Sequence, residues 1–365
     1  MGLGRELFPP FAAKTPETQV TQANIDNRLI DAAGEGDSAA VERLLAEGAN
    51  PRALHSNTSM TALFSAAHAG NAALMRRLLP LSDPKQAGLH DEPLLFAAVS
   101  GGKAECVDLA IEHGLPDTVN AVNQWGMNAV CLAASLGHAK AMERLIERGA
   151  SLSCATPLGG KLENGRNPLH WAALSGDINC ARLALSPERA AARDEEGRTP
   201  FMLAAMGADA VDLLLLLAPD ADLFAMDVDG RDALAVAASS GHMENVVHLW
   251  MDANMGRSAQ SSMSAVQWAL DTGAWECADW LGSRLPRPDR EAMWKGSVIH
   301  GPLNQYPLST RQLEARLPAW SAAIAAQEES REIAQAVAAV SEKRKGSRSG
   351  NARGRGAQNR LATRL

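Results

Sequence analysis

The sequence contains few aromatic residues and no long apolar run. Phe, Trp and Tyr together make up 4% of its 365 residues, and Tyr306 is the single tyrosine. A large mixed core or a β-sandwich ordinarily uses more aromatic rings, whereas helices rich in Ala and Leu pack closely without them. The one sustained apolar run, residues 213–217, is far shorter than the roughly 20 residues that cross a bilayer. The composition therefore favours packed helices and predicts no membrane span.

The sequence also lacks an export signal and an ordered set of cysteines. Residues 1–14 contain no apolar stretch of signal-peptide length, and Glu6 stands where myristoylation requires Ser or Thr. The cysteines form no CxxC pair and have no regular metal-binding spacing: Cys106, Cys131, Cys154, Cys180 and Cys277. Four of them fall in stretches predicted to be helical, where a free cysteine packs as a small hydrophobe. We therefore expect reduced thiols and a cytoplasmic location.

Catalytic motifs are missing as well. GxSxG, HExxH, the P-loop and GxGxxG do not occur in the required context. His170 stands at a predicted helix start, and Asp227–Gly230 resembles part of a calcium loop but lacks its ligand spacing and closing Glu. We expect no enzyme activity, no metal and no cofactor. An active site within residues 283–342 is the one enzymatic alternative.

What the sequence does have is an internal repeat. A pair of small residues followed two or three positions later by Gly recurs through most of the chain. The second residues of these pairs lie 31 to 39 positions apart, and they are Ala33, Ala67, Ala98, Ala134, Ala173, Ala205, Ala238 and, in a weaker copy, Leu270. In the sixth copy the terminating Gly, Gly207, comes one residue early. Periods of this length are typical of solenoids.

Each copy reads as a helix, a loop and a second helix. Thr or Asn caps the first helix, in some copies with Pro at its first position as in Thr199-Pro200. The Gly after the small pair ends that helix, because Gly adopts a positive φ at little cost. The second helix carries apolar residues at helical spacing, as in Val41, Leu44 and Leu45. A single unit leaves its apolar face exposed, so stacked units supply the core.

These residues resemble the ankyrin repeat family. The matching pieces are Asn167-Pro168-Leu169-His170-Trp171-Ala172-Ala173, Thr199-Pro200-Phe201, Gly137-His138, Gly241-His242-Met243-Glu244 and Gly48-Ala49-Asn50. The resemblance covers residues 25–282 in about eight repeats and implies an all-α ankyrin-repeat solenoid. It implies a scaffold or adaptor that binds a partner protein through hairpin tips and concave helices. Bacterial proteins of this type are often delivered into host cells, so a host-directed effector is a further interpretation.

The chain outside the repeats divides by composition. We expect an N-terminal extension over residues 1–22, the repeats over 23–282 and a capping segment over 283–317. Pro318 then opens an Ala- and Glu-rich helix that continues to residue 342. Residues 343–365 place basic side chains among Gly, Ser and Asn, a composition typical of a disordered tail.

Two sets of residues are candidates for binding a partner protein. Gln124 and Trp125 fall on a predicted hairpin tip, where an exposed aromatic ring anchors a partner or, alternatively, packs along the neighbouring hairpin. Four residues between the small pair and the Gly are expected to form an apolar stripe on the concave face: Val99, Leu136, Leu174 and Met206. The alternative for this stripe is contact with the next hairpin.

Charge supplies a third candidate surface. Residues 194–232 contain ten acidic residues and only Arg198 and Arg231 as cations, a net charge of −8. Asp194, Glu195, Asp227 and Asp229 are the acidic residues we expect to face a partner. The alternative is an ordinary solvated face, since acidic residues also form turns.

The tail carries the opposite charge. Residues 343–365 contain eight basic residues and no acid: Lys343, Arg344, Lys345, Arg348, Arg353, Arg355, Arg360 and Arg364. Such a segment suits loose contact with nucleic acid, although no aromatic residues are interleaved to stack on bases. The alternatives are a nuclear-import signal at residues 343–345 and weak docking on the acidic repeats. The runner-up function is therefore a nucleic-acid-associated protein.

Overall fold

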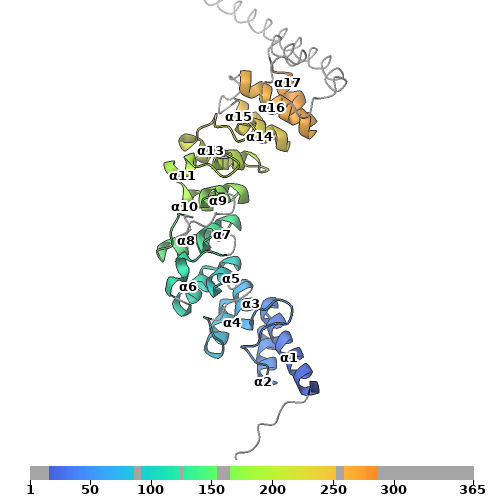
Figure 1. Cartoon of the computed structure of the whole chain (residues 1–365), viewed down its shortest axis with the longest axis vertical. Coiled ribbons are helices and arrows are strands. Elements are labelled where there is room, and N and C mark those ends of the chain that lie inside the picture. The colour runs from blue at the N-terminus through green and yellow to red at the C-terminus, as the bar shows by residue number, and fades with distance from the viewer. Residues whose placement is uncertain are drawn as a thin grey trace, which may run out of the picture. The chain divides into compact units, whose positions relative to one another are not determined.

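The computed structural model describes residues 16–85, 92–114, 116–123, 126–153, 165–251 and 259–285. Throughout these ranges the regular structure is helical, apart from one isolated β-bridge between Val122 and Asn128. The prediction of an all-α fold is confirmed. The chain forms two compact units, Met1–Ala233 and Leu234–Leu365, and Figure 1 labels most of their α-helices.

The first unit is a series of helix pairs (Figure 1). The first helices of the pairs are α1 (Pro16–Glu35), α3 (Ala62–His68), α5 (Leu94–Ser100), α7 (Ala129–Ser135), α9 (Pro168–Ser175) and α12 (Pro200–Ala205). The second helices are α2 (Ser38–Ala46), α4 (Ala72–Leu78), α6 (Ala104–His113), α8 (Ala139–Glu147), α10 (Ile178–Ala184) and α13 (Val211–Leu217). Shorter helices between them are η1 (Leu79–Leu81), η3 (Pro116–Asn120), α11 (Pro187–Ala191) and η5 (Ala218–Asp220).

First helices begin at the capping residues that the sequence predicts. The backbone N–H of Cys131 donates to Asn128 Oδ1 at 2.8 Å, and that of Met202 donates to Thr199 Oγ1 at 3.3 Å. Each bond satisfies a backbone donor that has no partner within the helix. Gly137, with φ of 69°, follows the end of α7 in the left-handed conformation.

The core lies between two rows of helices. α3, α5, α7, α9 and α12 contact one another in succession, and α4, α6, α8, α10 and α13 form the second row. The Ala pairs are buried between neighbouring first helices, where small side chains allow close approach. Phe64, Phe96 and Phe201 fill the larger spaces and are almost fully buried. Burial of this apolar surface holds each pair on the next.

The third repeat differs from its predicted register by one residue. Gly102, and not Gly101, has the positive φ, at 68°, and its N–H donates to the carbonyl of Val99. Val99 therefore occupies the core position that Ala67 and Ala134 occupy in their repeats, and its exposed fraction is 0%. The prediction that Val99 belongs to an exposed stripe is wrong.

The sixth repeat ends its first helix in a different way from the others. Gly207 lacks a positive φ, and Asp209 takes the left-handed conformation instead, with φ of 51°. Asp is one of the few residues other than Gly that adopt this conformation, because its short side chain bonds to the local backbone. Asp209, two residues later, therefore adopts the left-handed conformation that was predicted for Gly207.

The second unit contains α14 (Ala233–Ser240), α15 (Met243–Met251), α16 (Ala259–Thr272) and α17 (Trp275–Gly282). The rings of Trp250 and Trp280 meet edge to face, with centroids 6.0 Å apart. The guanidinium of Arg284 lies 3.6 Å from the Trp280 centroid, a cation–π contact. Beyond residue 285 the predicted capping segment, helix and basic tail lie outside the described residues.

The described cysteines are of two kinds. Cys106, Cys180 and Cys277 are free and buried, and burial raises the pKa of their thiols to about 11, about 12 and about 11. These three thiols are protonated and packed as hydrophobes, as expected. Cys131 is disulfide-bonded, so the expectation of reduced thiols is wrong for this residue.

Candidate partner-binding surface

Three of the described links between helix pairs are closed by tight turns that share one hydrogen-bond pattern. We call residues 123–127, 194–198 and 227–231 the tip turns. In the second of these, the N–H of Asp194 donates to the carbonyl of Arg198 at 2.9 Å, and the N–H of Gly197 donates back to the Asp194 carbonyl at 2.9 Å. Gly197 has φ of 73°, which the turn requires. The same two bonds recur in the other tip turns.

A buried carboxylate organises the turn at residues 194–198. Asp194 Oδ1 accepts the backbone N–H groups of Glu196 and Arg198 at 3.1 and 2.8 Å. Its Oδ2 lies 3.2 Å from both Arg166 Nε and Arg198 Nη2. The Asp194 side chain is 0% exposed. A charge that is fully paired and hydrogen-bonded in this way holds one backbone geometry.

The neighbouring aromatic residues extend this arrangement. The Arg166 guanidinium lies 5.2 Å from the Trp171 ring centroid. His170 Nδ1 accepts the N–H of Asn167 at 3.2 Å, and its Nε2 bonds the carbonyl of Arg198 at 3.1 Å. Burial lowers the pKa of His170 to about 4, so the neutral ring fits this pair of bonds. His170 thus lies at the helix start that the sequence predicts and bonds the local backbone through both ring nitrogens.

The turn at residues 227–231 repeats the pattern with fewer partners. Asp227 Oδ1 accepts the N–H groups of Asp229 and Arg231 at 3.0 and 2.8 Å, and its Oδ2 lies 2.7 Å from Arg231 Nε. The Asp227 side chain is also 0% exposed. The prediction that Asp194 and Asp227 face a partner is therefore wrong, because both carboxylates point inward to hold turns.

Two hydrogen bonds tie these neighbouring segments together. The N–H of Val228 donates to the carbonyl of Glu196 at 3.0 Å. Arg193 Nη1 donates to the carbonyl of Met226 at 2.5 Å. The second turn is therefore positioned by the first, and the residues between them have defined directions.

The segments that lead into the tip turns, and the matching segment before the wider turn at residues 55–60, alternate between inward and outward side chains. We call these segments the Arg52 arm (residues 52–56), the Asn120 arm (120–123), the Ala191 arm (191–195) and the Phe224 arm (224–228). Their third residue points outward in each case, and in three arms it is a large apolar residue: Leu54, Val122 and Met226, exposed by 51%, 36% and 47%. The corresponding residue of the Ala191 arm is Arg193, which is also exposed. A row of outward side chains thus recurs from repeat to repeat.

The arm residues are absent from the site predicted above, although the sequence contains a signal for them. Phe224, Met226 and Val228 alternate with Ala225 and Asp227, a period of two that indicates an extended segment with one buried side. The acidic residues of the same stretch instead favour its interpretation as a charged surface.

The other predicted site residues have mixed positions. Leu136 and Leu174 are 45% and 39% exposed at the ends of α7 and α9, and Met206 is half-buried at the end of α12. Glu195 is exposed, and Asp229 is exposed but paired with Arg231 at 2.9 Å. Gln124 and Trp125 lie outside the described residues, as does the basic tail.

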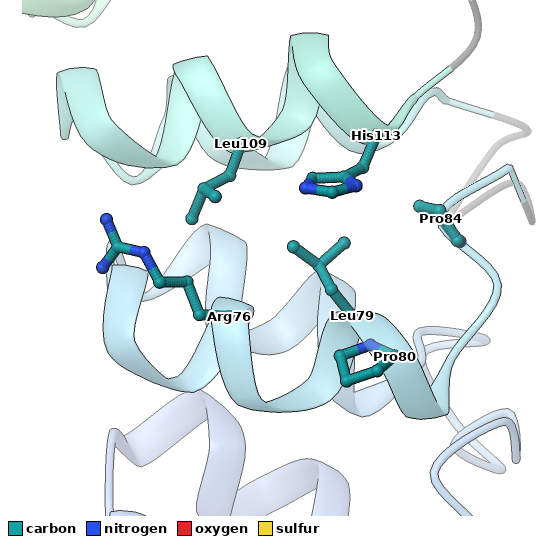
Figure 2. A pocket seen from close by; sticks show the side chains of 6 residues that line it. All are labelled: Arg76, Leu79, Pro80, Pro84, Leu109 and His113. Atoms are coloured by element: carbon teal, nitrogen blue, oxygen red, sulfur yellow. The ribbon is translucent and has the colours of Figure 1, made fainter.

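A separate hollow of about 430 Å³ lies between α4 with η1 and α6 (Figure 2). In Figure 2, Leu79 and Leu109 point toward one another across it, and His113 lies beside them. Arg76, at its edge, is paired with Glu105. Pro80 and Pro84 complete a lining that is mainly aliphatic and proline. Its polar side chains are Arg76, which is paired with Glu105, and His113.

The described part of the chain contains no cluster of three or more His, Cys, Asp or Glu side chains suited to a metal ion. In the same ranges, none of the helices combines the length and apolar character needed to cross a membrane. In the first unit, the arms present exposed side chains on a backbone that hydrogen-bonded turns hold in place.

Comparisons with known proteins agree with the helix-pair architecture. The family model for ankyrin repeats (3 copies) matches residues 29–114, 81–156 and 151–227. The expected span of about eight repeats over 25–282 is broader than this match, which ends at residue 227.

Individual relatives match the repeats alone. Neurogenic locus notch homolog protein 1 of Mus musculus is 32% identical over 171 residues, which are 43% of this chain and 6% of that protein. Probable E3 ubiquitin-protein ligase XBOS33 of Oryza sativa subsp. japonica is 35% identical over 140 residues, 37% of this chain and 25% of that protein. The chain thus spans a small part of the length of these curated relatives.

Proposed function

We propose that this chain, which belongs to the ankyrin repeat family, is a scaffold that binds a partner protein through its hairpin arms and the exposed ends of its first-row helices. Repeats of this kind stack into extended surfaces that bind other proteins. The observation that carries the proposal is the row of outward arm residues, Leu54, Val122 and Met226, set on segments that end in hydrogen-bonded turns.

The geometry of the arms suits binding. Because hydrogen bonds already hold the backbone of the arms, a partner that covers these side chains orders their rotamers but need not order the backbone. Leu136 and Leu174 add exposed apolar surface at the ends of neighbouring helices α7 and α9. Exposed apolar groups that recur along one series of repeats are typical of an interaction surface.

The test is capture of proteins by the immobilised full chain from extracts of the cells that express it, with identification by mass spectrometry. The arm variant L54S/V122S/M226S removes the outward apolar side chains. The control is Leu215→Ser on the second-row helix α13, whose side chain is 54% exposed. We expect a set of proteins captured by wild type and by the control and lost with the arm variant. The same set captured by all three chains would contradict the proposal.

A second candidate function rests on the eight basic residues of the tail, residues 343–365. A cationic segment of this composition suits contact with nucleic-acid phosphates, and such binding weakens steeply as salt is added. Nuclease treatment of the captured material and deletion of residues 343–365 distinguish this candidate. Capture that depends on nucleic acid and on the tail would favour it over the scaffold.

A further inference from the structure

The Phe224 arm, which follows α13 and η5, differs from the other arms in presenting three large apolar side chains on one side. Phe224, Met226 and Val228 are exposed by 50%, 47% and 65%, whereas Ala225 and Asp227, which alternate with them, are 3% and 7% exposed. Alternate side chains of an extended segment lie about 7 Å apart on the same side. The arm therefore offers a narrow apolar strip, which we call the Phe224 strip (Phe224, Met226 and Val228).

The matching positions of the other described arms are mixed or polar. The Arg52 arm presents Arg52, Leu54 and Ser56, and the Ala191 arm presents Ala191, Arg193 and Glu195. All these residues are exposed, so the positions are outward in each arm. The fold does not require apolar side chains at these outward positions. Packing within the repeats therefore does not account for the three apolar side chains of the Phe224 strip.

The Phe224 strip is held in place along its whole length. The N–H of Phe224 donates to Asp222 Oδ1 at 3.2 Å, the Met226 carbonyl accepts from Arg193, and the Val228 N–H donates to Glu196. These bonds fix the direction of the three side chains before any partner arrives. Preorganisation of this kind lowers the entropic cost of binding.

The charge around the Phe224 strip is strongly negative. Residues 205–232 contain seven acidic residues against a single cation, Arg231. Asp220 and Asp222 are exposed before the strip, Asp229 is exposed after it, and Glu195 is exposed on the adjoining turn. Arg231 is already paired with Asp227 and Asp229, and Arg193 donates to the Met226 carbonyl. Among the described residues, Asp220, Asp222 and Glu195 are exposed and form no ion pair, so a cationic ligand meets free carboxylates beside the apolar side chains.

We propose that the Phe224 strip binds an extended, basic segment of a partner protein, in which apolar side chains alternate with Lys or Arg. This rests on the proposed scaffold function and names the chemistry of one partner. Alternate apolar side chains of the segment cover Phe224, Met226 and Val228, and its cations lie against Asp220, Asp222 and Glu195. The chain's own tail is a poor occupant, because its basic residues stand among Gly, Ser and Asn without apolar alternation.

The test measures fluorescence anisotropy of labelled peptides with the full chain. The probe is a peptide of about ten residues in which Leu and Val alternate with Lys. Two further peptides serve as comparisons: one carries Glu in place of each Lys, and one has the same composition with its apolar residues grouped together. We expect the alternating basic peptide to bind at least about tenfold more tightly than either comparison at low salt.

Two variants locate the binding. F224S/V228S removes two apolar side chains without changing charge, and Ser occupies the equivalent positions elsewhere, at Ser153 and Ser56. We expect it to weaken binding by about tenfold or more. Leu215→Ser removes a similarly exposed side chain, 54% exposed, from the second-row helix α13 and is expected to leave the affinity unchanged. Equal weakening by both would overturn the assignment to the Phe224 strip.

Asp222→Asn tests the electrostatic part. Asn50 occupies the equivalent position and its Oδ1 accepts the N–H of Arg52 at 3.1 Å, so the amide preserves the local bond. We expect binding roughly two- to threefold weaker at low salt and no difference at high salt, where screening acts on both chains. A wild-type chain that binds the three peptides equally refutes the basic-segment proposal. The arm-dependent capture of proteins described above then still decides the scaffold function separately.

Discussion

The Ala191 arm and the Phe224 arm are neighbours with the same backbone and different surfaces. Both lead into a turn with Asp first, Gly fourth and Arg fifth, and both turns form the same backbone and carboxylate bonds. Their outward residues have nothing in common: Ala191, Arg193 and Glu195 in one, Phe224, Met226 and Val228 in the other. The positions that hold the turn are dictated by backbone hydrogen bonding, and the positions between them are free to specify a partner.

The two turns also differ in the number of arginines that pair with the buried carboxylate. Asp194 holds two arginines from different segments, Arg166 and Arg198, and both guanidinium side chains are 12% exposed. Asp227 holds one arginine, Arg231, which is 23% exposed. Removal of Asp194 therefore affects two arginines, whereas removal of Asp227 affects one.

The largest expected effect is therefore that of Asp194→Ala. It removes the buried carboxylate that two nearly buried arginines share and leaves them only the partly exposed Glu196, so it should lower the free energy of unfolding by about 3–5 kcal/mol. Asp227→Ala should cost less, about 2–3 kcal/mol, since it removes bonds around a better-solvated arginine. Denaturant unfolding of both variants measures the difference, and a larger loss for Asp227→Ala would contradict the account of the turns.

The next effect is a pH dependence centred on His170. The pKa of the buried ring is about 4, below the ordinary value near 6.5, so the unfolded chain binds the proton more readily between these values. The stabilisation is complete above about pH 6.5 and falls as pH drops toward about 4, by up to about 3 kcal/mol.

His170→Gln is the matched variant, because Gln at this position of a capping box also bonds the cap backbone but does not titrate. Urea unfolding across this pH range should give a shallower loss of stability for the variant than for wild type. Identical slopes would show that His170 does not titrate as its burial indicates.

A smaller effect on the free energy of unfolding distinguishes substitutions at two glycines, Gly137 and Gly34. Gly137 has φ of 69°, and the nearest atom to an added Cβ, Asp177 Cβ, is an unstrained 3.5 Å away. Gly137→Val should therefore destabilise by about 1–3 kcal/mol through backbone strain alone. Gly34 lies within α1 without a positive φ, and Gly34→Ala should stabilise by about 0.5–1 kcal/mol. Melting curves that shift in the same direction for both variants would contradict this distinction.

The smallest effect on stability is expected at the Phe224 strip. F224S/V228S replaces two exposed side chains and should change the free energy of unfolding by less than about 0.5 kcal/mol. Denaturant unfolding beside Asp227→Ala measures the contrast between outward and inward positions of one arm. A loss comparable to that of Asp227→Ala would mean that the outward side chains are structural.

Much of the architecture could be predicted because capping residues, small pairs and Gly recur with a fixed period. Val99 was misplaced because Gly101 and Gly102 both follow the small pair, and composition does not reveal which of them adopts the positive φ. Asp194 and Asp227 were misplaced for a related reason: an acidic residue that holds a turn and one that faces solvent look the same in a sequence. Arg166, which lies outside the acidic stretch, supplies part of the charge that neutralises Asp194.

The central claim, that the arms and not the second-row helices contact a partner, has a direct test within one repeat. Met226 and Leu215 are both apolar and similarly exposed, at 47% and 54%, but Met226 is on an arm and Leu215 on α13. The measurement is site-specific photocrosslinking, with a benzoylphenylalanine placed at either position of the full chain in the cells that express it. We predict that the probe at position 226 crosslinks discrete proteins. The probe at position 215 should crosslink none of these proteins. The same crosslinked proteins from both positions, or from position 215 alone, would contradict the claim.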